Sequence, residues 1–128
     1  MKKLIIKSKE EPWSAINITD EIQKEIAEGF NGLLLIYSPD TEVNILTGEY
    51  DEVLPIDYSR TAQNILAEAR PYTAENGEAY TFNFMHACEK VIPVTDGKIS
   101  LGLLLQVYLF DAVGGGKDRV LWLYKLEG

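Results

Sequence analysis

The chain contains one histidine, His86, and one cysteine, Cys88, so it cannot build a metal site from several imidazole and thiolate ligands. A nucleophile–base pair needs two side chains within hydrogen-bond reach and a third group that orients the base. Residues two positions apart share one face of a strand without such a third group, and on a helix they diverge. We therefore expect His86 and Cys88 to have structural roles.

A glycine-rich segment, Gly114-Gly115-Gly116-Lys117, could offer backbone N–H groups to a phosphate. A P-loop, however, needs a helix after the glycines and a Ser or Thr after the lysine. Asp118 follows the lysine here, and the residues after it have the composition of a strand. The segment is therefore expected to be a flexible turn.

Several carboxylates gather between positions 40 and 52, and carboxylate oxygens are the ligands that hard divalent cations prefer. Their spacing lacks the alternation and the glycine of a calcium loop, which favours a solvated acidic face. A divalent cation held near Asp40 and Glu49 is the alternative, and no other metal or cofactor is indicated. The remaining members of the group are Glu42, Asp51 and Glu52.

Hydrophobic periodicity predicts helices at 19–29 and 57–70. Thr19 is a suitable N-cap for the first helix, Gly29 suits its end, and Pro71 stops the second. Strands are predicted at 3–8, 32–37, 41–46, 98–111 and 119–126. The last two strands are expected to form a β-hairpin around the turn 112–117.

Two hydrophobic segments need separate comment. Segment 78–88 is ambiguous, because Tyr80, Phe82 and Phe84 alternate as in a strand while the flanking residues suit a helix. In segment 98–111 the leucines at alternate positions are expected in the core or in a subunit contact. They are Leu101, Leu103 and Leu105.

The interspersed helices and strands indicate an α+β fold with mostly antiparallel sheets and two or three helices. A length of 128 residues suits a single domain, 1–128. The net charge of −8 makes nucleic acid and membrane surfaces unfavourable partners. Apolar runs are too short for a membrane span, and a single cysteine allows no internal disulfide, so we expect a cytoplasmic protein.

Three segments, in this order, resemble motifs of the YjbQ family, small proteins described as secondary thiamine-phosphate synthase enzymes. Segment 18–23 reads ITDEIQ, segment 91–102 reads VIPVTDGKISLG, and segment 107–111 reads VYLFD, followed by RVL at 119–121. They are similar to the family's I-T-D-E-[VI]-Q, V-P-V-x-D-G-x-L-x-L-G and I-Y-L-x-E-x-D-G-P-R patterns. Order and spacing match over almost the entire chain, so a diverged member of this family is indicated.

The first site motif of the resembled family is altered. Its P-H-T-T-A-A motif falls on 39–44, so its histidine corresponds to Asp40 and the next residue to Thr41. The acid that follows in the family is similar to Glu49, but the asparagine before it has become Gly48.

The second site motif, N-A-x-A-H, falls on 76–80. Asn76 is kept, but the histidine is Tyr80. Because the family has a helix in this region, the resemblance predicts a helix at 80–87 and so decides the ambiguous segment.

A third motif, G-T-W-Q, falls on 102–105 and keeps only its glycine. The resemblance also implies a homotrimer and a small anionic or phosphate-bearing ligand. The positions that it assigns to catalysis are Asp40, Glu49 and Tyr80, and those that it assigns to ligand binding are Asn76, Thr41, Gly102 and Arg119.

An imidazole is a base near neutral pH, whereas an aspartate is normally ionised and a tyrosine normally protonated. Asp40 and Tyr80 therefore cannot do the work of two histidines, and we expect the ancestral activity to be lost or changed. The alternative is an oligomeric small-ligand or protein-binding module on the same scaffold, with a pocket made more apolar by the leucines at 103–105. An open cleft that held Asp40, Glu49, Asn76 and Tyr80 together would favour ligand binding.

Overall fold

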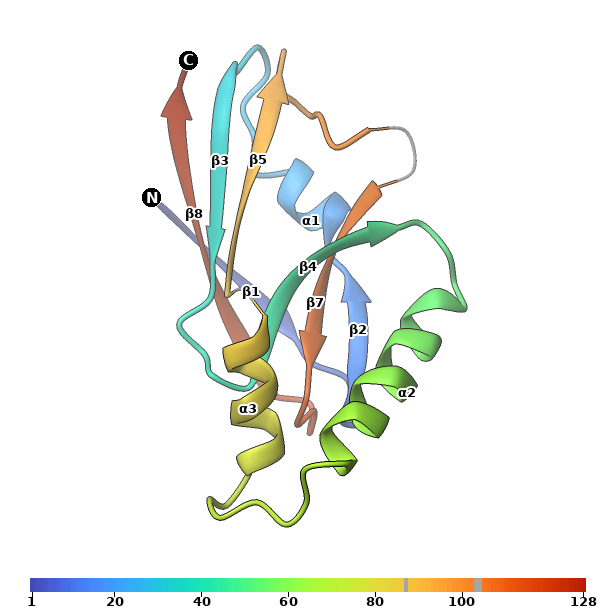
Figure 1. Cartoon of the computed structure of the whole chain (residues 1–128). Helices are drawn as coiled ribbons and strands as arrows, with labels where there is room; N and C mark the ends of the chain where they lie inside the picture. The colour runs from blue at the N-terminus through green and yellow to red at the C-terminus, as the bar shows by residue number, and fades with distance from the viewer. Residues whose placement is uncertain (87, 103–104) are drawn as a thin grey trace.

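Two antiparallel β-sheets face each other in the computed structural model, which describes residues 1–86, 88–102 and 105–128 (Figure 1). The five-stranded sheet has, in spatial order, β1 (Lys2–Lys7), β8 (Asp118–Glu127), β3 (Gly32–Tyr37), β5 (Glu89–Thr95) and β6 (Lys98–Ile99). The three-stranded sheet has β2 (Ser14–Asn17), β7 (Leu105–Asp111) and β4 (Val43–Glu49). The helices are α1 (Thr19–Gln23), α2 (Leu54–Ala67) and α3 (Gly77–Met85).

The main core lies between the two sheets and is aliphatic. Alternate residues of each strand point into it, including Leu34 and Ile36 of β3 and Ile45 of β4. Ile22 of the short helix α1 is buried in the same cluster. Each such side chain stabilises the fold by about 1.5–3 kcal/mol through removal of its surface from water.

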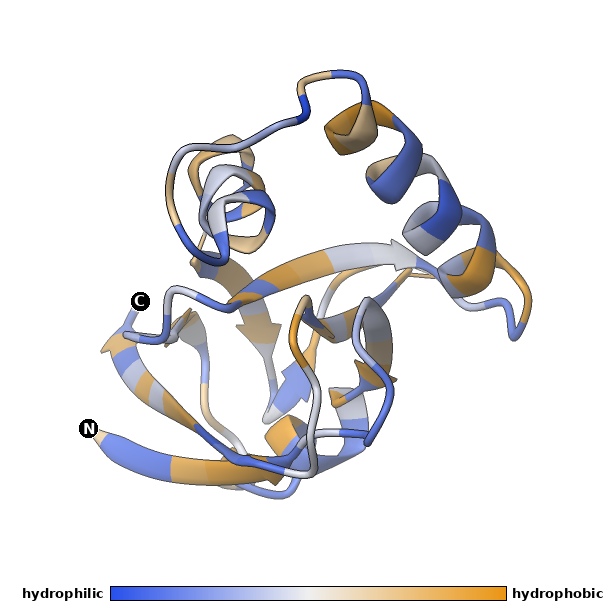
Figure 2. Ribbon diagram, turned by 90° about the horizontal axis from the view of Figure 1, so that it is seen from below, coloured by the Kyte–Doolittle hydropathy of each residue, from blue (hydrophilic) through white to orange (hydrophobic). Residues whose placement is uncertain are grey.

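A second core, rich in aromatic residues, lies where α2 and α3 cover the other face of the three-stranded sheet (Figure 2). The ring centroids of Phe82 on α3 and Phe110 on β7 are 5.2 Å apart. Trp13 packs edge-on against Phe82 at 5.6 Å, and Tyr58 of α2 packs edge-on against Phe110 at 5.0 Å. These tilted and edge-on contacts are the geometries that aromatic pairs favour.

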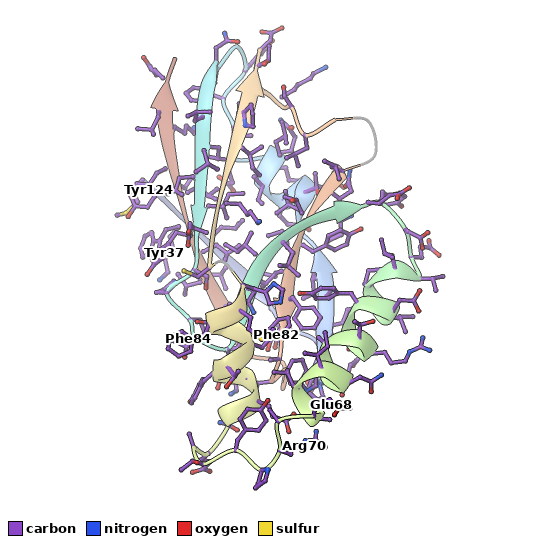
Figure 3. The ribbon with its side chains drawn as sticks, viewed as in Figure 1. Tyr37, Glu68, Arg70, Phe82, Phe84 and Tyr124 are labelled. Atoms are coloured by element: carbon purple, nitrogen blue, oxygen red, sulfur yellow. The ribbon has the colours of Figure 1, made fainter. Side chains whose placement is uncertain are left out.

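The outer face of the five-stranded sheet carries apolar side chains that no described residue covers. Val91 of β5 is 57% exposed and Leu126 of β8 is 59% exposed. Figure 3 shows Tyr37 and Tyr124 on this side of the molecule, with Phe84 projecting from α3 on the same side of the view. We call the outward-facing set the outer apolar face: Ile5, Leu33, Tyr37, Val91, Tyr124 and Leu126.

The predicted α+β class, with mostly antiparallel sheets, is confirmed, and strands 32–37 and 3–8 are found at or within one residue of their expected bounds. The helix predicted in segment 78–88 is confirmed as α3, although Ala87, its expected last residue, lies outside the described residues. None of the helices that the structure describes has the length and apolar character needed to cross a bilayer.

The bounds of the other helices differ from the prediction. α1 ends at Gln23 rather than near Gly29, and Ile18 rather than Thr19 occupies its N-cap position. The Thr19 hydroxyl instead accepts a hydrogen bond from the backbone N–H of Val107, at 2.8 Å, and so joins α1 to β7.

Helix α2 lies three residues earlier than predicted, over 54–67 rather than 57–70. The side chain of Asp51 accepts hydrogen bonds from the backbone N–H groups of Val53 and Leu54 at 2.7 and 3.2 Å. This satisfies two of the donors that a helix leaves free at its start.

The predicted β-hairpin of 98–111 with 119–126 is wrong. Segment 98–111 divides into β6 and β7, and β7 pairs with β2 and β4 while β8 pairs with β1 and β3. The chain changes sheets at Gly114, where φ is +70° and a Cβ would lie 2.4 Å from the main-chain oxygen of Glu11. Of the leucine stripe, Leu101 packs partly buried against the main core, Leu105 is exposed, and Leu103 lies outside the described residues.

Two strands were not predicted. β2 has only four residues, too few for a readable alternation. β5 contains Pro93, which normally argues against a strand, but Pro93 lies beyond the two-residue ladder with β6, where the chain has strand β3 on one side only.

Candidate functional site

Arg119 of β8 lies at the centre of a buried ion cluster. Its side chain is 3% exposed, and its Nε and Nη2 donate to the two carboxylate oxygens of Asp111 at 2.7 and 3.0 Å. Its Nη1 donates to Asp40 at 2.7 Å and to Glu42 at 3.0 Å. Burial disfavours the charge, but the hydrogen bonds and negative charges of these carboxylates outweigh burial and raise the pKa of Arg119.

Asp40 uses both of its carboxylate oxygens within this cluster. Oδ2 accepts from Arg119, and Oδ1 accepts from the backbone N–H of Glu42 at 2.8 Å. The next residue, Thr41, is exposed. The position where the resemblance expected a histidine therefore holds an acid that fixes the loop between β3 and β4.

The glycine-rich segment is a turn, as predicted, and its N–H groups face the protein. Gly114 donates to Asp111 Oδ1 at 2.8 Å, and Gly115 donates to the main-chain oxygen of Glu10 at 3.0 Å. The N–H of Lys117 donates to the hydroxyl of Ser8 at 2.8 Å. These donors are occupied by protein acceptors, so the turn does not have the arrangement of a phosphate cradle.

The predicted site residues on α3 lie apart from the ion cluster. Asn76 has a left-handed backbone (φ +56°) at the start of α3 and lines a hollow of about 590 Å³ that also contacts Trp13 and Tyr72. Tyr80 lies one turn further along α3 and is 39% exposed. Gly102 lies between β6 and β7, with φ +99° and open space around it.

Glu49 ends β4 and is exposed, and its main-chain oxygen accepts a hydrogen bond from the hydroxyl of Tyr108 at 3.1 Å. Described residues line the hollow beside Asn76 and two further hollows, of about 200 and 890 Å³. Each of the three contains at most one of Asp40, Glu49, Asn76 and Tyr80. Within the described ranges, no group of three or more His, Cys, Asp or Glu side chains is arranged to hold a metal ion.

His86 and Cys88 have separate partners. The Cys88 thiol donates to Glu89 at 3.1 Å, and burial first, then this carboxylate, raises the pKa of the thiol. The His86 ring lies 4.3 Å from the ring of Phe82 and faces the hydroxyl of Tyr58.

Tyr58 and His86 face each other in a small hollow between α2 and the three-stranded sheet, whose wall also includes Thr47, Glu49 and Tyr108. Its volume is about 200 Å³, and most of its wall is apolar. Burial raises the pKa of Tyr58 to about 12. Burial and the nearby charge of Lys90 lower the pKa of His86 below its usual value, so both groups are uncharged at neutral pH. We call this space the Tyr58–His86 hollow; it is lined by Ala15, Leu46, Thr47, Gly48, Glu49, Leu54, Pro55, Tyr58, His86, Tyr108 and Phe110.

A larger and more polar cleft, of about 890 Å³, lies on the other side of Pro55 and Tyr108, which line both spaces. The amide of Asn17 donates to the side chain of Gln106 at 3.2 Å within it. Five carboxylates but only two basic side chains line this cleft, so it favours a cation over an anion. The carboxylates are those of Glu11, Asp20, Glu21, Asp51 and Glu52, and the bases are Lys9 and Arg60.

Sequence reasoning did not find the Tyr58–His86 hollow. The sequence places Tyr58 only within the predicted helix 57–70, and it predicts a structural role for His86. The two lie 28 positions apart, and no local pattern joins them.

The comparisons with known proteins agree with the resemblance found in the sequence. A family model described as "UPF0047 protein YjbQ-like" matches residues 2–126. The chain belongs to the YjbQ family. No curated protein matches it.

Several solved structures have the same fold as this chain. A conserved hypothetical protein of Thermus thermophilus is 21% identical, with a TM-score of 0.87 over 98% of this chain and 100% of that chain. A hypothetical protein of Aeropyrum pernix K1 is 23% identical, with a TM-score of 0.85 over the full length of both chains. A protein of Sulfolobus solfataricus P2, described as YbjQ-like and of unknown function, is 20% identical, with a TM-score of 0.85 over 99% of this chain and 96% of that chain. At these identities the likeness concerns the fold of the family.

Replacement of Arg119 by leucine is expected to lower the free energy of unfolding by about 3–5 kcal/mol, because Asp111 would remain buried without its counter-charge. Arg60→Leu is the matched control, since Arg60 pairs with Asp57 in water and its loss should cost less than about 1 kcal/mol. Urea unfolding at pH 7 measures both values. Equal losses in the two variants would contradict a structural role for the cluster.

The lowered pKa of His86 predicts a pH dependence of stability. The unfolded chain binds a proton at His86 near pH 6.5, and the folded protein binds it only at lower pH. The contribution of His86 is therefore complete above about pH 6.5 and is lost as the pH falls through the folded-state pKa. The groups that face the ring are Tyr58 of α2, Phe82 of α3 and Lys90 of β5.

Because the chain has one histidine, a proton NMR titration gives a single imidazole signal. Its midpoint is expected below 6.5, and His86→Phe should lose less stability than the wild type between pH 7 and pH 5. A midpoint above 6.5 would show that burial does not dominate at this ring.

Proposed function

We propose that this protein is a YjbQ-family member that has lost thiamine-phosphate-synthase-like activity and acts as a self-associating module. We further propose that it binds a small ligand in a place other than a cleft shared by Asp40, Glu49, Asn76 and Tyr80, since no described hollow contains more than one of them. The observation that carries the loss of activity is the position of Asp40. Its two carboxylate oxygens are bonded to Arg119 and to the backbone of Glu42. A carboxylate committed to these two partners neutralises Arg119 and shapes the loop, and it is not placed to act as the base of a reaction.

The other positions that the resemblance assigned to the site support the same proposal. Arg119 directs four hydrogen bonds to carboxylates and is buried, so it has little capacity for a phosphate-bearing ligand. Tyr80, on α3, replaces the second histidine with a phenol, which does not accept a proton near neutral pH. A cytoplasmic location and an anionic ligand stay predictions. The carboxylates that line the cleft of about 890 Å³ favour a ligand that is neutral or positive.

The loss of activity can be tested by growth. Expression of the protein in a bacterium without thiamine-phosphate synthase is expected to give no growth in the absence of thiamine, because the two imidazole positions hold Asp40 and Tyr80. A family member that keeps both histidines serves as the positive control, and soluble expression is checked in the same cells. Growth supported by the wild-type chain would overturn the proposed loss.

Self-association is supported by the outer apolar face. Exposed apolar side chains of this number on neighbouring strands are unusual for a monomer in water. Head-to-tail contacts between copies of such a face close into rings such as the proposed homotrimer.

The oligomeric state is measured by analytical ultracentrifugation. The wild type is expected to sediment at three times the 14.4 kDa of one chain. The double variant Val91→Glu, Leu126→Glu should sediment as a monomer, because it places charge on the outer apolar face. Ile65→Glu is the control, since Ile65 is an exposed residue of α2 and its variant should keep the wild-type mass. A monomeric wild type would refute self-association without affecting the growth test.

A further inference from the structure

The Tyr58–His86 hollow is open to solvent on one side and has a volume of about 200 Å³. This volume exceeds that of an engineered apolar cavity of about 150 Å³ that binds benzene. A single substituted aromatic ring therefore fits its volume.

The hollow exists because β4 carries a glycine where its neighbours carry side chains. Leu46 and Gly48 face the helices from alternate positions of β4, and both line the hollow. A Cβ added to Gly48 would meet Tyr108 at 3.9 Å, which is an ordinary contact. The space beside Gly48 is thus free to hold either a larger side chain or a ligand.

Tyr58 and His86 do not form a good hydrogen bond with each other. The Tyr58 hydroxyl lies 3.5 Å from Nδ1 and 3.3 Å from Nε2 of His86, at nearly equal distances from the two nitrogens. Neither distance is that of a well-formed hydrogen bond, and one hydroxyl proton can serve only one nitrogen. A ligand group with a hydrogen-bond donor would find an acceptor on the imidazole.

Aromatic packing holds the ring of His86 in place. Its centroid lies 4.3 Å from that of Phe82, and Phe82 packs in turn against Phe110. Tyr58 and His86 are both uncharged at neutral pH, because burial raises the pKa of Tyr58 to about 12 and lowers the pKa of His86. Most of the wall of the hollow is apolar, and such a wall favours an uncharged ligand over an ion.

We propose that the Tyr58–His86 hollow binds a neutral single-ring aromatic compound that carries one hydroxyl or amine group, with His86 as its hydrogen-bonding partner. This inference rests on the proposed ligand-binding role, but not on the loss of the ancestral activity or on self-association. It names a chemical class: phenols and anilines of about the size of cresol.

The probes are phenol and toluene, which differ in hydrogen bonding but hardly in size. Isothermal titration and the single imidazole NMR signal follow their binding at pH 7.5. The wild type is expected to bind phenol about tenfold more tightly than toluene, which corresponds to one net hydrogen bond. The imidazole signal should shift with phenol.

Two variants separate shape from hydrogen bonding. His86→Phe keeps an aromatic ring against Phe82 and should abolish the preference for phenol while toluene still binds. Gly48→Ile fills the hollow and should weaken both probes by at least about tenfold. Thr61→Ile, at an exposed position of α2 that does not line the hollow, is the matched control and should bind as the wild type does.

The inference is overturned if the wild type binds neither probe at concentrations up to roughly 10 mM. It is equally overturned if Gly48→Ile binds phenol as the wild type does. Because the wild-type comparison of phenol with toluene needs no variant, the test stands even where His86→Phe fails to fold. Growth without thiamine and the sedimentation mass are independent of these results, so failure here is distinguishable from failure of the proposed function.

Discussion

The burial of one positive charge organises this structure. Removal of an ion from water costs several kcal/mol, so the guanidinium of Arg119 must be surrounded by carboxylates. They come from the end of β7, through Asp111, and from the connection between β3 and β4, through Asp40 and Glu42. Since Arg119 belongs to the five-stranded sheet and Asp111 to the three-stranded sheet, the cluster fastens the two sheets at one end. The same Asp111 carboxylate accepts the N–H groups of Val113 and Gly114 and so shapes the turn between the sheets.

The polar side chains at one end of the molecule are used to neutralise Arg119. Those in the helical layer are available to contact a ligand. Asp40 is at the position where the family resemblance expects a histidine, but it is committed to charge neutralisation. The uncommitted polar groups lie elsewhere, between α2 and the three-stranded sheet, where Tyr58 faces His86. Family membership therefore describes the scaffold, while the groups able to meet a ligand follow from the residues of the site itself.

The sequence predicted those features that local residues determine. β3 is a short buried run and was placed correctly, and α2 was found from its apolar stripe because periodicity is a local signal. The false hairpin shows the limit, since the choice of partner strands depends on residues far along the chain. For the same reason, Asp40 was identified as an altered position but not as the partner of Arg119, which lies 79 residues away. The segment 103–104, expected to make the pocket apolar, lies outside the described residues.

The two cores differ in composition, and this difference has a consequence for stability within the native state. The aliphatic core is enclosed by strands from both sheets, whereas the aromatic core is closed on one side by α2 and α3 alone. Loosening of these two helices would expose the aromatic rings but leave the ladders of both sheets paired. We therefore expect the helical layer to open at a lower free energy than the sheets, while the rest of the molecule stays folded.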